Sequence, residues 1–133
     1  MADKKGCSVE GLHYIDPDKK ARLIKKKVKE LNQIFELMPD DNKKLSGDLI
    51  QNVAWMAIEL QELQMIIHST GSVEEYHNGA NQSGLKLSAA VQAYNSIVKS
   101  YNSSLRLLLA ELPGAESRAT AKDQLAPFIV GNE

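Results

Sequence analysis

The chain of 133 residues has a formal net charge of -1, with 25% charged and 43% hydrophobic residues. This length predicts one domain and is small for an enzyme that binds two substrates. The single cysteine, Cys7, excludes an internal disulfide framework and a site built from several thiolates. The polar N-terminus does not resemble a secretory signal, and no apolar run reaches the roughly 18 residues of a membrane span. We therefore expect a cytoplasmic protein without membrane contact.

Positive charge is concentrated in one short stretch near the N-terminus. Seven bases and two acids between Asp18 and Glu30 give a local balance of +5, whereas residues 45–133 have a balance of -4. Such a patch attracts polyanions even when the whole chain is nearly neutral. We therefore identify seven candidate DNA contacts, with a merely solvated helix face as the alternative: Lys19, Lys20, Arg22, Lys25, Lys26, Lys27 and Lys29.

The basic stretch lies in the first expected helix, over about residues 17–38. Residues 1–15 have no sustained periodicity and are expected to form a flexible arm. Asp16 is a suitable N-cap, and Pro17 suits the first helical position because its missing N–H would have no partner there. Pro39 ends the pattern, since proline disfavours a helical residue before it.

Two longer helices are expected over about residues 46–69 and 88–112, and Ser88 is a suitable cap for the second. Spacings of three and four residues place an apolar heptad stripe on each helix. The first of the two has further apolar residues beside its stripe, so it needs two packing partners. The stripes either pack on each other within one chain or form contacts between subunits. The candidate oligomer-interface residues are Leu49, Val53, Met56, Leu60, Leu63, Val91, Tyr94, Val98, Tyr101, Leu105 and Leu108.

The polar connector between these helices contains GANQSGLKLS, residues 79–88, which resembles a phosphate-binding loop. Such a loop requires its lysine directly after the second glycine, but here Leu85 separates Gly84 from Lys86. No apolar strand precedes the stretch, and two upstream glutamates would repel a triphosphate. The sequence therefore predicts a flexible interhelical connector rather than a nucleotide site.

No other group of residues predicts catalysis or a metal site. His68, Glu74, Glu75 and His77 have side chains that bind divalent ions, but their spacing matches no strong motif, so we interpret them as surface residues. Cys7 lies in the expected arm, outside any setting that would stabilise a thiolate. We expect neither an enzyme nor a cofactor, because no convergent set of polar groups is evident.

No segment shows convincing strand alternation, so the patterns predict an all-α fold. We expect one helical domain over residues 16–125, in which the basic helix precedes a long helical hairpin. The Pro113-Gly114 pair ends the hairpin, and a short C-terminal helix follows it. Residues 126–133 form an apolar tail.

The region from about Leu49 to Leu125 has a particular order of features. A long apolar helix leads to a glycine-containing connector, then to GLKLSAAVQAYNSIVKSYNSSLRLLLAEL and finally to PGAESRA. This order resembles the small subunit of tailed-phage terminases. The residues that correspond to that family's K-x-x-P-like helix start, L-x-x-L-G-L helix end and Ser-Arg pair are Lys86, Leu87, Ser88 and Ala89, then LLLAEL, then Ser117 and Arg118. Leu87-Ser88 replaces the family's usual histidine-proline, and LPGAE replaces its LGLTP pattern.

The resemblance implies a non-catalytic protein that forms a homo-oligomeric ring in the cytoplasm of the bacterial host cell. Such a protein binds viral double-stranded DNA and presents it to the terminase large subunit, which carries the ATPase and the nuclease. The assignment of the seven basic residues to DNA contact comes from their charge and not from a family motif. The alternative is a helical protein-interaction or scaffold module without nucleic-acid binding, because such a module explains the heptads equally well.

Overall fold

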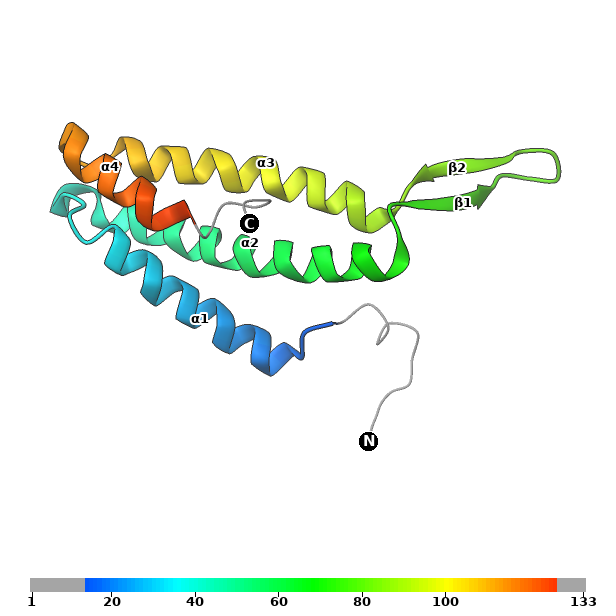
Figure 1. The fold of residues 1–133 in the computed structure, drawn as a ribbon, viewed down its shortest axis with the longest axis horizontal. Helices are drawn as coiled ribbons and strands as arrows, with labels where there is room; N and C mark the ends of the chain where they lie inside the picture. The colour runs from blue at the N-terminus through cyan, green and yellow to red at the C-terminus, as the bar shows by residue number, and fades with distance from the viewer. Residues whose placement is uncertain (1–13, 127–133) are drawn as a thin grey trace.

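A computed structural model describes residues 14–126, so most of the expected arm and tail lie outside the described residues. In the described part, helices surround a long central helix, and a two-stranded hairpin extends from one end (Figure 1). In chain order the elements are α1 (Pro17–Ile34), the 3-10 helix η2 (Asp40–Asn42), α2 (Lys43–Thr70), β1 (Val73–His77), β2 (Ser83–Leu87), α3 (Ala89–Ala110) and α4 (Gly114–Leu125).

Helix α2 is the centre of the fold. It packs against α1 on one side and against the antiparallel α3 on another, while α4 returns over α1 and α3 (Figure 1). This arrangement confirms the prediction that the second helix needs two packing partners. The side chains with the largest fully buried volume come from all three long helices, and each contributes roughly 1.5–3 kcal/mol by leaving water. They are Tyr101, Leu31, Ile58, Leu60, Leu108 and Val53.

The helix ends follow local chemistry. The Asp16 carboxylate accepts hydrogen bonds from the backbone N–H groups of Asp18 and Lys19, at 3.1 and 3.3 Å, which confirms the expected N-cap. Ser88 caps α3 in the same way, because its hydroxyl accepts from the Val91 N–H at 3.2 Å. Helix α2 ends at Thr70 and is capped by Gly71. The backbone φ of Gly71 is 94°, a value that residues other than glycine rarely adopt.

Helix α1 is shorter than expected, since it ends at Ile34 rather than near residue 38. The N–H of Met38 bonds to the carbonyl oxygen of Phe35 at 3.0 Å, so the chain turns tightly after the last helical residue. This turn buries both Phe35 and Met38 against the core, and Pro39 follows it. Burial of two large apolar side chains in the turn therefore replaces one further turn of helix.

The expectation of an all-α fold was wrong for the connector. Residues 73–87 form an antiparallel hairpin in which Val73 pairs with Leu87 and His77 with Ser83. The alternation was not visible in the sequence because nearly every side chain of both strands is exposed. Neither face is covered by a helix of the described part of the chain, so no apolar-polar pattern of period two is required.

The folded region also begins before residue 16, where the sequence placed the end of the arm. Ile15 is buried, and the N–H groups of Tyr14 and Ile15 both bond to the carboxylate of Glu62 in α2. These two residues therefore belong to the helical domain, whereas residues 1–13 and Cys7 among them lie outside the described part of the chain.

Candidate nucleic-acid interface

The seven basic residues of α1 do not all lie on the same side of the helix. With about 100° between successive residues, five of them fall on one arc of roughly 120°, and all five are exposed: Lys19, Arg22, Lys25, Lys26 and Lys29. Lys20 and Lys27 fall instead within the arc spanned by Ile34, Leu31, Ile24 and Val28, which pack in or against the core. The structure thus divides the predicted DNA contacts into an outer row of five and two inner cations.

Lys20 is an anchor between α1 and α2. Its ammonium lies 2.6 Å from a carboxylate oxygen of Glu59 and 2.7 Å from one of Glu62. The second oxygen of Glu62 accepts the N–H groups of Ile15 and Tyr14 at 3.0 and 3.1 Å. The Glu62 side chain is only 6% exposed, so its charge is neutralised by one ammonium and two backbone donors.

The electrostatics of this anchor favour the charged forms of both partners. Burial opposes the charge of Glu62, but the hydrogen bond from Lys20 and the bonds from Ile15 and Tyr14 outweigh it and lower the pKa of the carboxyl group. Burial likewise opposes the charge of Lys20, whereas the hydrogen bonds and charges of Glu59 and Glu62 raise the pKa of its ammonium above the ordinary value. Lys20 is therefore committed to the fold rather than to a ligand.

Lys27 is the second inner cation. Its ammonium lies 3.5 Å from the carboxylate of Glu30, one turn further along α1. A pair at this spacing on a helix is a weak local contact, worth about 0.3–0.5 kcal/mol. The Lys27 side chain is 20% exposed, so its charge is much less accessible than those of the outer row.

The outer row is a continuous positive surface. Its members at positions 19, 22, 26 and 29 are spaced by three, four and three residues, with Lys25 beside them. The row is about 15 Å long at 1.5 Å per residue. No acidic residue occurs between positions 19 and 29, and none of the five forms an ion pair with another described residue. Their charges are therefore not neutralised by described neighbours.

The heptad residues are placed mainly inside the chain. Seven of the eleven candidate interface residues are buried between α2 and its neighbours, namely Val53, Met56, Leu60, Leu63, Tyr101, Leu105 and Leu108. The other four are half-buried, namely Leu49, Val91, Tyr94 and Val98. Of the two alternatives that the pattern left open, packing within one chain accounts for the seven buried side chains. Among the eleven candidates, only the four half-buried residues have side-chain surface that a second copy could contact.

The phosphate-loop-like stretch forms the turn and second strand of the hairpin. Gly79 lies in the turn with φ of 84°, while Gly84 and Lys86 lie within β2. The Lys86 ammonium is 3.7 Å from the carboxylate of Glu74 on the paired strand. A phosphate loop needs backbone N–H groups that converge at a helix N-terminus, and a paired strand directs them sideways instead.

The residues considered for a metal site are dispersed. His68 lies near the end of α2, Glu74 lies on one face of β1, and Glu75 and His77 lie on its other face. Within the described residues, no group of three or more His, Cys, Asp or Glu side chains is arranged to hold an ion.

Ser117 and Arg118, which correspond to the Ser-Arg pair of the resemblance, stabilise the turn between α3 and α4. The Arg118 guanidinium donates to the carbonyl oxygen of Leu112 at 3.0 Å, beyond the end of α3 where positive charge is favourable. The Ser117 hydroxyl donates to the carbonyl oxygens of Pro113 and Gly114. The geometry of the described chain thus gives the pair a structural role.

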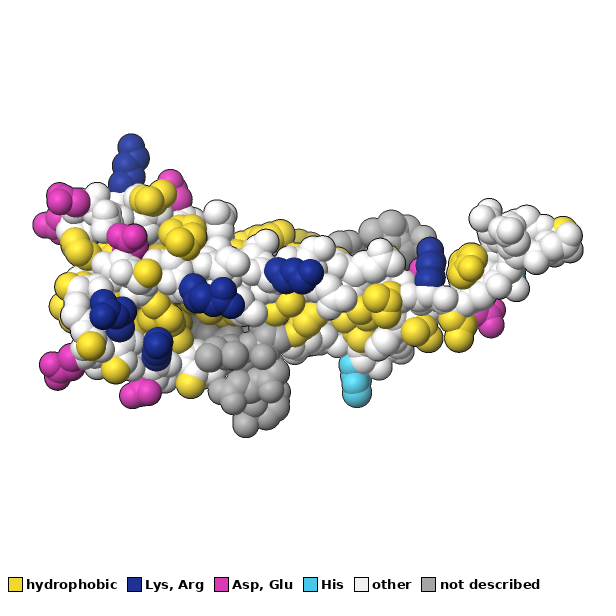
Figure 2. All heavy atoms as spheres, turned by 90° about the horizontal axis from the view of Figure 1, so that it is seen from above, with side chains coloured by type: hydrophobic (Ala, Val, Ile, Leu, Met, Phe, Trp, Pro, Cys, Tyr) yellow, Lys and Arg dark blue, Asp and Glu magenta, His cyan; other side chains and the backbone are white. Residues whose placement is uncertain are grey.

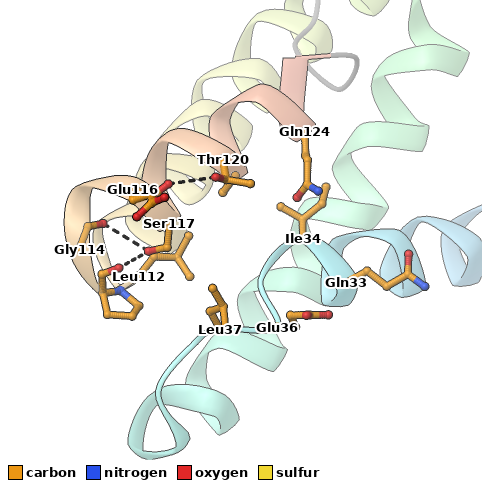
Figure 3. A pocket seen from close by; sticks show the side chains of 12 residues that line it. Gln33, Ile34, Glu36, Leu37, Leu112, Gly114, Glu116, Ser117, Thr120 and Gln124 are labelled. Atoms are coloured by element: carbon orange, nitrogen blue, oxygen red, sulfur yellow. Dashed lines mark hydrogen bonds between the residues drawn. The ribbon is translucent and has the colours of Figure 1, made fainter.

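An open groove of about 790 Å³ lies between the C-terminal end of α1 and α4. Figure 3 shows Ile34 and Leu37 on one wall and Ser117 and Thr120 on the other. Its charged lining residues are Glu36 and Glu116, which repel a polyanion. Acidic side chains also gather at this end of the face in Figure 2, opposite the hairpin. The charged side chains of the groove are therefore acidic, whereas those of the outer row are basic, and the groove does not extend the positive surface.

The sequence pattern did not identify Glu59 and Glu62 as partners of Lys20. The available signal was an acid next to Leu60 and another next to Leu63 in the apolar heptad stripe, because a charge that becomes buried there requires a counter-charge. Periodicity alone does not tell which of the N-terminal cations supplies it. Only the packing of α1 on α2 selects Lys20.

Comparisons with family models, with curated proteins and with solved structures find no match to this chain. Among the described residues, no helix has the length and apolar character to cross a membrane.

Proposed function

We propose that this chain is a DNA-binding subunit of the phage-terminase type, a non-catalytic homo-oligomer that presents viral double-stranded DNA to a large ATPase and nuclease subunit in the host cytoplasm. The proposal is supported by the sequence resemblance over the helical hairpin together with the outer row of α1. The observation that carries the DNA-binding part is this row of five exposed cations on one helix face.

The physical argument concerns the unneutralised charge of the row. A helix that is only solvated usually alternates acids and bases at intervals of three or four residues, which neutralises its surface. The outer row lacks such acids over eleven successive positions, 19–29. Contacts between lysine or arginine and phosphates release condensed counterions from DNA, and this release gives affinity that does not depend on base sequence.

The test is a titration of labelled duplex DNA with the full-length protein between about 50 and 200 mM salt. If all five cations contact phosphates, the logarithm of the binding constant falls with the logarithm of salt concentration with a slope of about -4 to -5. A variant carrying Lys25→Glu, Lys26→Glu and Lys29→Glu loses at least about 100-fold in affinity and most of this slope.

The matched control carries Lys44→Glu, Lys99→Glu and Lys122→Glu, which change the net charge equally at exposed positions on other helices. We expect it to retain the salt slope and to lose only a few-fold in affinity. Equal loss in both variants would show that binding follows total charge and not the outer row. Absence of wild-type binding at low salt refutes the DNA-binding function.

The second candidate function is a helical protein-interaction or scaffold module without nucleic-acid binding. The observation that favours it is the exposed apolar surface of the β1–β2 hairpin. The Val73, Leu85 and Leu87 side chains of this hairpin are 53%, 69% and 47% exposed. Exposed apolar clusters mark surfaces that bind other proteins. A protein that assembles normally but does not bind duplex DNA at low salt would support this candidate.

A further inference from the structure

The hairpin formed by β1 and β2 extends away from the helices and leaves both of its edges open (Figure 1). Among the described residues, its strands pair only with each other, and no helix covers them. A two-stranded hairpin alone is marginally stable in water. Open strand edges also present backbone N–H and C=O groups to any further strand. Such a hairpin is stabilised when another element pairs with it or covers it.

The two faces of the hairpin differ in the contacts that their side chains make. On one face the ring of Tyr76 lies over Gly84, where an added Cβ would be only 3.1 Å from a ring carbon, and Lys86 faces Glu74. The other face carries Val73, Leu85 and Leu87, the exposed apolar residues described above, together with the polar residues Glu75, His77 and Ser83. On the first face the side chains contact one another, whereas the second face leaves its three apolar side chains exposed.

The hydrogen-bond pattern defines which backbone groups are available. Ser88 donates to the carbonyl oxygen of Ser72, and Asn78 donates to that of Gln82, both at 2.8 Å. Because inward and outward pairs alternate in an antiparallel ladder, the odd-numbered residues 73, 75 and 77 of β1 and 83, 85 and 87 of β2 direct their backbone groups outward. Each strand therefore offers the backbone N–H and C=O groups of three alternate residues to a new strand.

The two edges carry opposite charge. Glu74 and Glu75 make the β1 edge acidic, whereas Lys86 is the only charged residue of β2 and makes its edge basic. Glu74 and Lys86 already face each other at 3.7 Å, but their side chains are 43% and 52% exposed, so both charges remain accessible. Pairing of two β1 edges would bring the acids together, and pairing of two β2 edges would bring the lysines together, which is unfavourable.

We propose that the hairpin pairs edge to edge with the hairpin of a second copy of this chain, the acidic β1 edge of one meeting the basic β2 edge of the next. In the register of the hairpin itself, Lys86 then lies between its own Glu74 and Glu74 of the second copy. Leu87 lies beside Val73 of the second copy, which continues the apolar face. The inference deepens the self-association included in the proposed function but does not depend on DNA binding.

The geometry of this pairing leads to a closed assembly. Since β2 runs antiparallel to the next β1, all hairpins point the same way and all helical bodies lie at the same end. Such a contact is heterologous, and repetition of it forms a ring when the rotation closes. Closure satisfies every open edge, which removes the exposure that makes a single hairpin prone to nonspecific pairing.

The test uses two full-length variants with opposite changes. The first carries Glu74→Lys and Glu75→Lys, so that both edges are basic, and the second carries Lys86→Glu, so that both are acidic. Sedimentation velocity and native mass spectrometry measure assembly of each variant and of their equimolar mixture. A control carrying Glu36→Lys and Glu116→Lys makes the same charge change as the first variant in the groove between α1 and α4, at the end opposite the hairpin (Figure 1).

We expect the wild type and the control to assemble, and each hairpin variant alone to require at least about tenfold more protein. The mixture restores assembly to within a few-fold of wild type, with complexes of equal composition, because unlike edges are again available. Rescue by mixing separates an intermolecular contact from damage to the hairpin, since both variants have lost the Glu74–Lys86 pair.

Three results would overturn the inference: a wild type that stays monomeric at tens of micromolar, hairpin variants that assemble as the wild type does, or a mixture that stays apart. The DNA titration described above distinguishes this failure from failure of the proposed function. If the hairpin variants assemble normally, edge pairing is refuted, but DNA binding by the outer row of α1 is not. If the wild type does not bind DNA, the proposed function is refuted, but edge pairing is not.

Discussion

Replacement of Lys20 by methionine tests whether this cation belongs to the fold or to a ligand surface. Lys20→Met keeps an apolar stem of similar length and removes the ammonium that lies 2.6 and 2.7 Å from Glu59 and Glu62. Glu62 would keep its two backbone donors but would lose its counter-charge. Breaking a fully buried pair costs about 3–5 kcal/mol, and exposed pairs are worth about 0–1 kcal/mol.

The Lys20 side chain is 22% exposed and that of Glu62 is 6% exposed, so the pair lies between these limits. We expect Lys20→Met to lower the free energy of unfolding by about 1–3 kcal/mol. Urea unfolding followed by far-UV circular dichroism measures this loss as a lower midpoint with an unchanged slope. The matched variant Lys26→Met, in the outer row, changes stability by less than about 0.5 kcal/mol.

The pH dependence has a defined sign. The pKa of Glu62 is lowered from its ordinary 4.5, so its contribution is complete above that value and is lost as pH falls through the lowered pKa. The pKa of Lys20 is raised from 10.5, so its contribution is complete below that value and is lost as pH rises through the raised pKa. The stability difference between wild type and Lys20→Met is therefore largest between about pH 5 and pH 10 and decreases in acid.

DNA binding should respond to the two variants in the opposite order. Lys26→Met decreases the salt slope by about one unit, whereas Lys20→Met leaves the slope of the folded protein unchanged. Equal urea midpoints for the two variants would refute the anchor. A double-mutant cycle with Glu62→Gln isolates the coupling energy between the partners, and a coupling near zero would refute it as well.

Two further predictions concern the core and the backbone. Burial raises the pKa of Tyr101 to about 12, so ultraviolet titration should show one tyrosine that ionises near that pH. The free energy of unfolding should fall as pH rises above 10, because the unfolded side chain loses its proton first. Ionisation of all four tyrosines together below this range would contradict the burial of Tyr101. Gly47→Ala should raise the free energy of unfolding by about 0.5–1 kcal/mol, because Gly47 lies within α2 and an added Cβ meets nothing within 4 Å. Gly71→Ala should lower it by about 1–3 kcal/mol, because its φ of 94° is strained for alanine; urea midpoints that shift in the same direction for both substitutions would contradict this difference.

Much of the helical architecture was predictable from local signals. The starts of α1 and α3 are marked by local interactions with neighbouring residues, which act in the same way in any fold. The residues concerned are Asp16, Pro17 and Ser88. The apolar spacing of α2 also predicted two packing partners, because a helix cannot expose two apolar faces. These features depend on residues within a few positions of each other, which a single sequence displays directly.

The hairpin and the anchor were not predictable in the same way. The strands of the hairpin show no apolar alternation, since exposed strands need none, and their pairing depends on the closure of a turn over residues 78–82, NGANQ. The Lys20–Glu62 and Ile15–Glu62 contacts of the anchor join residues 42 and 47 positions apart in the chain. Nothing in the spacing of the seven cations distinguishes Lys20 from Lys26 until the orientation of α1 on α2 is known.

The sequence by itself determined that the chain is predominantly helical, about where its long helices begin, and that positive charge is concentrated near its N-terminus. The tertiary structure decided how these features are used. Packing of α1 turned Lys20 inward and left five cations outside, and packing of α2 on α3 buried most of the heptad residues within one chain. The physical reason is that charge and periodicity are properties of residues, whereas exposure is a property of their neighbours.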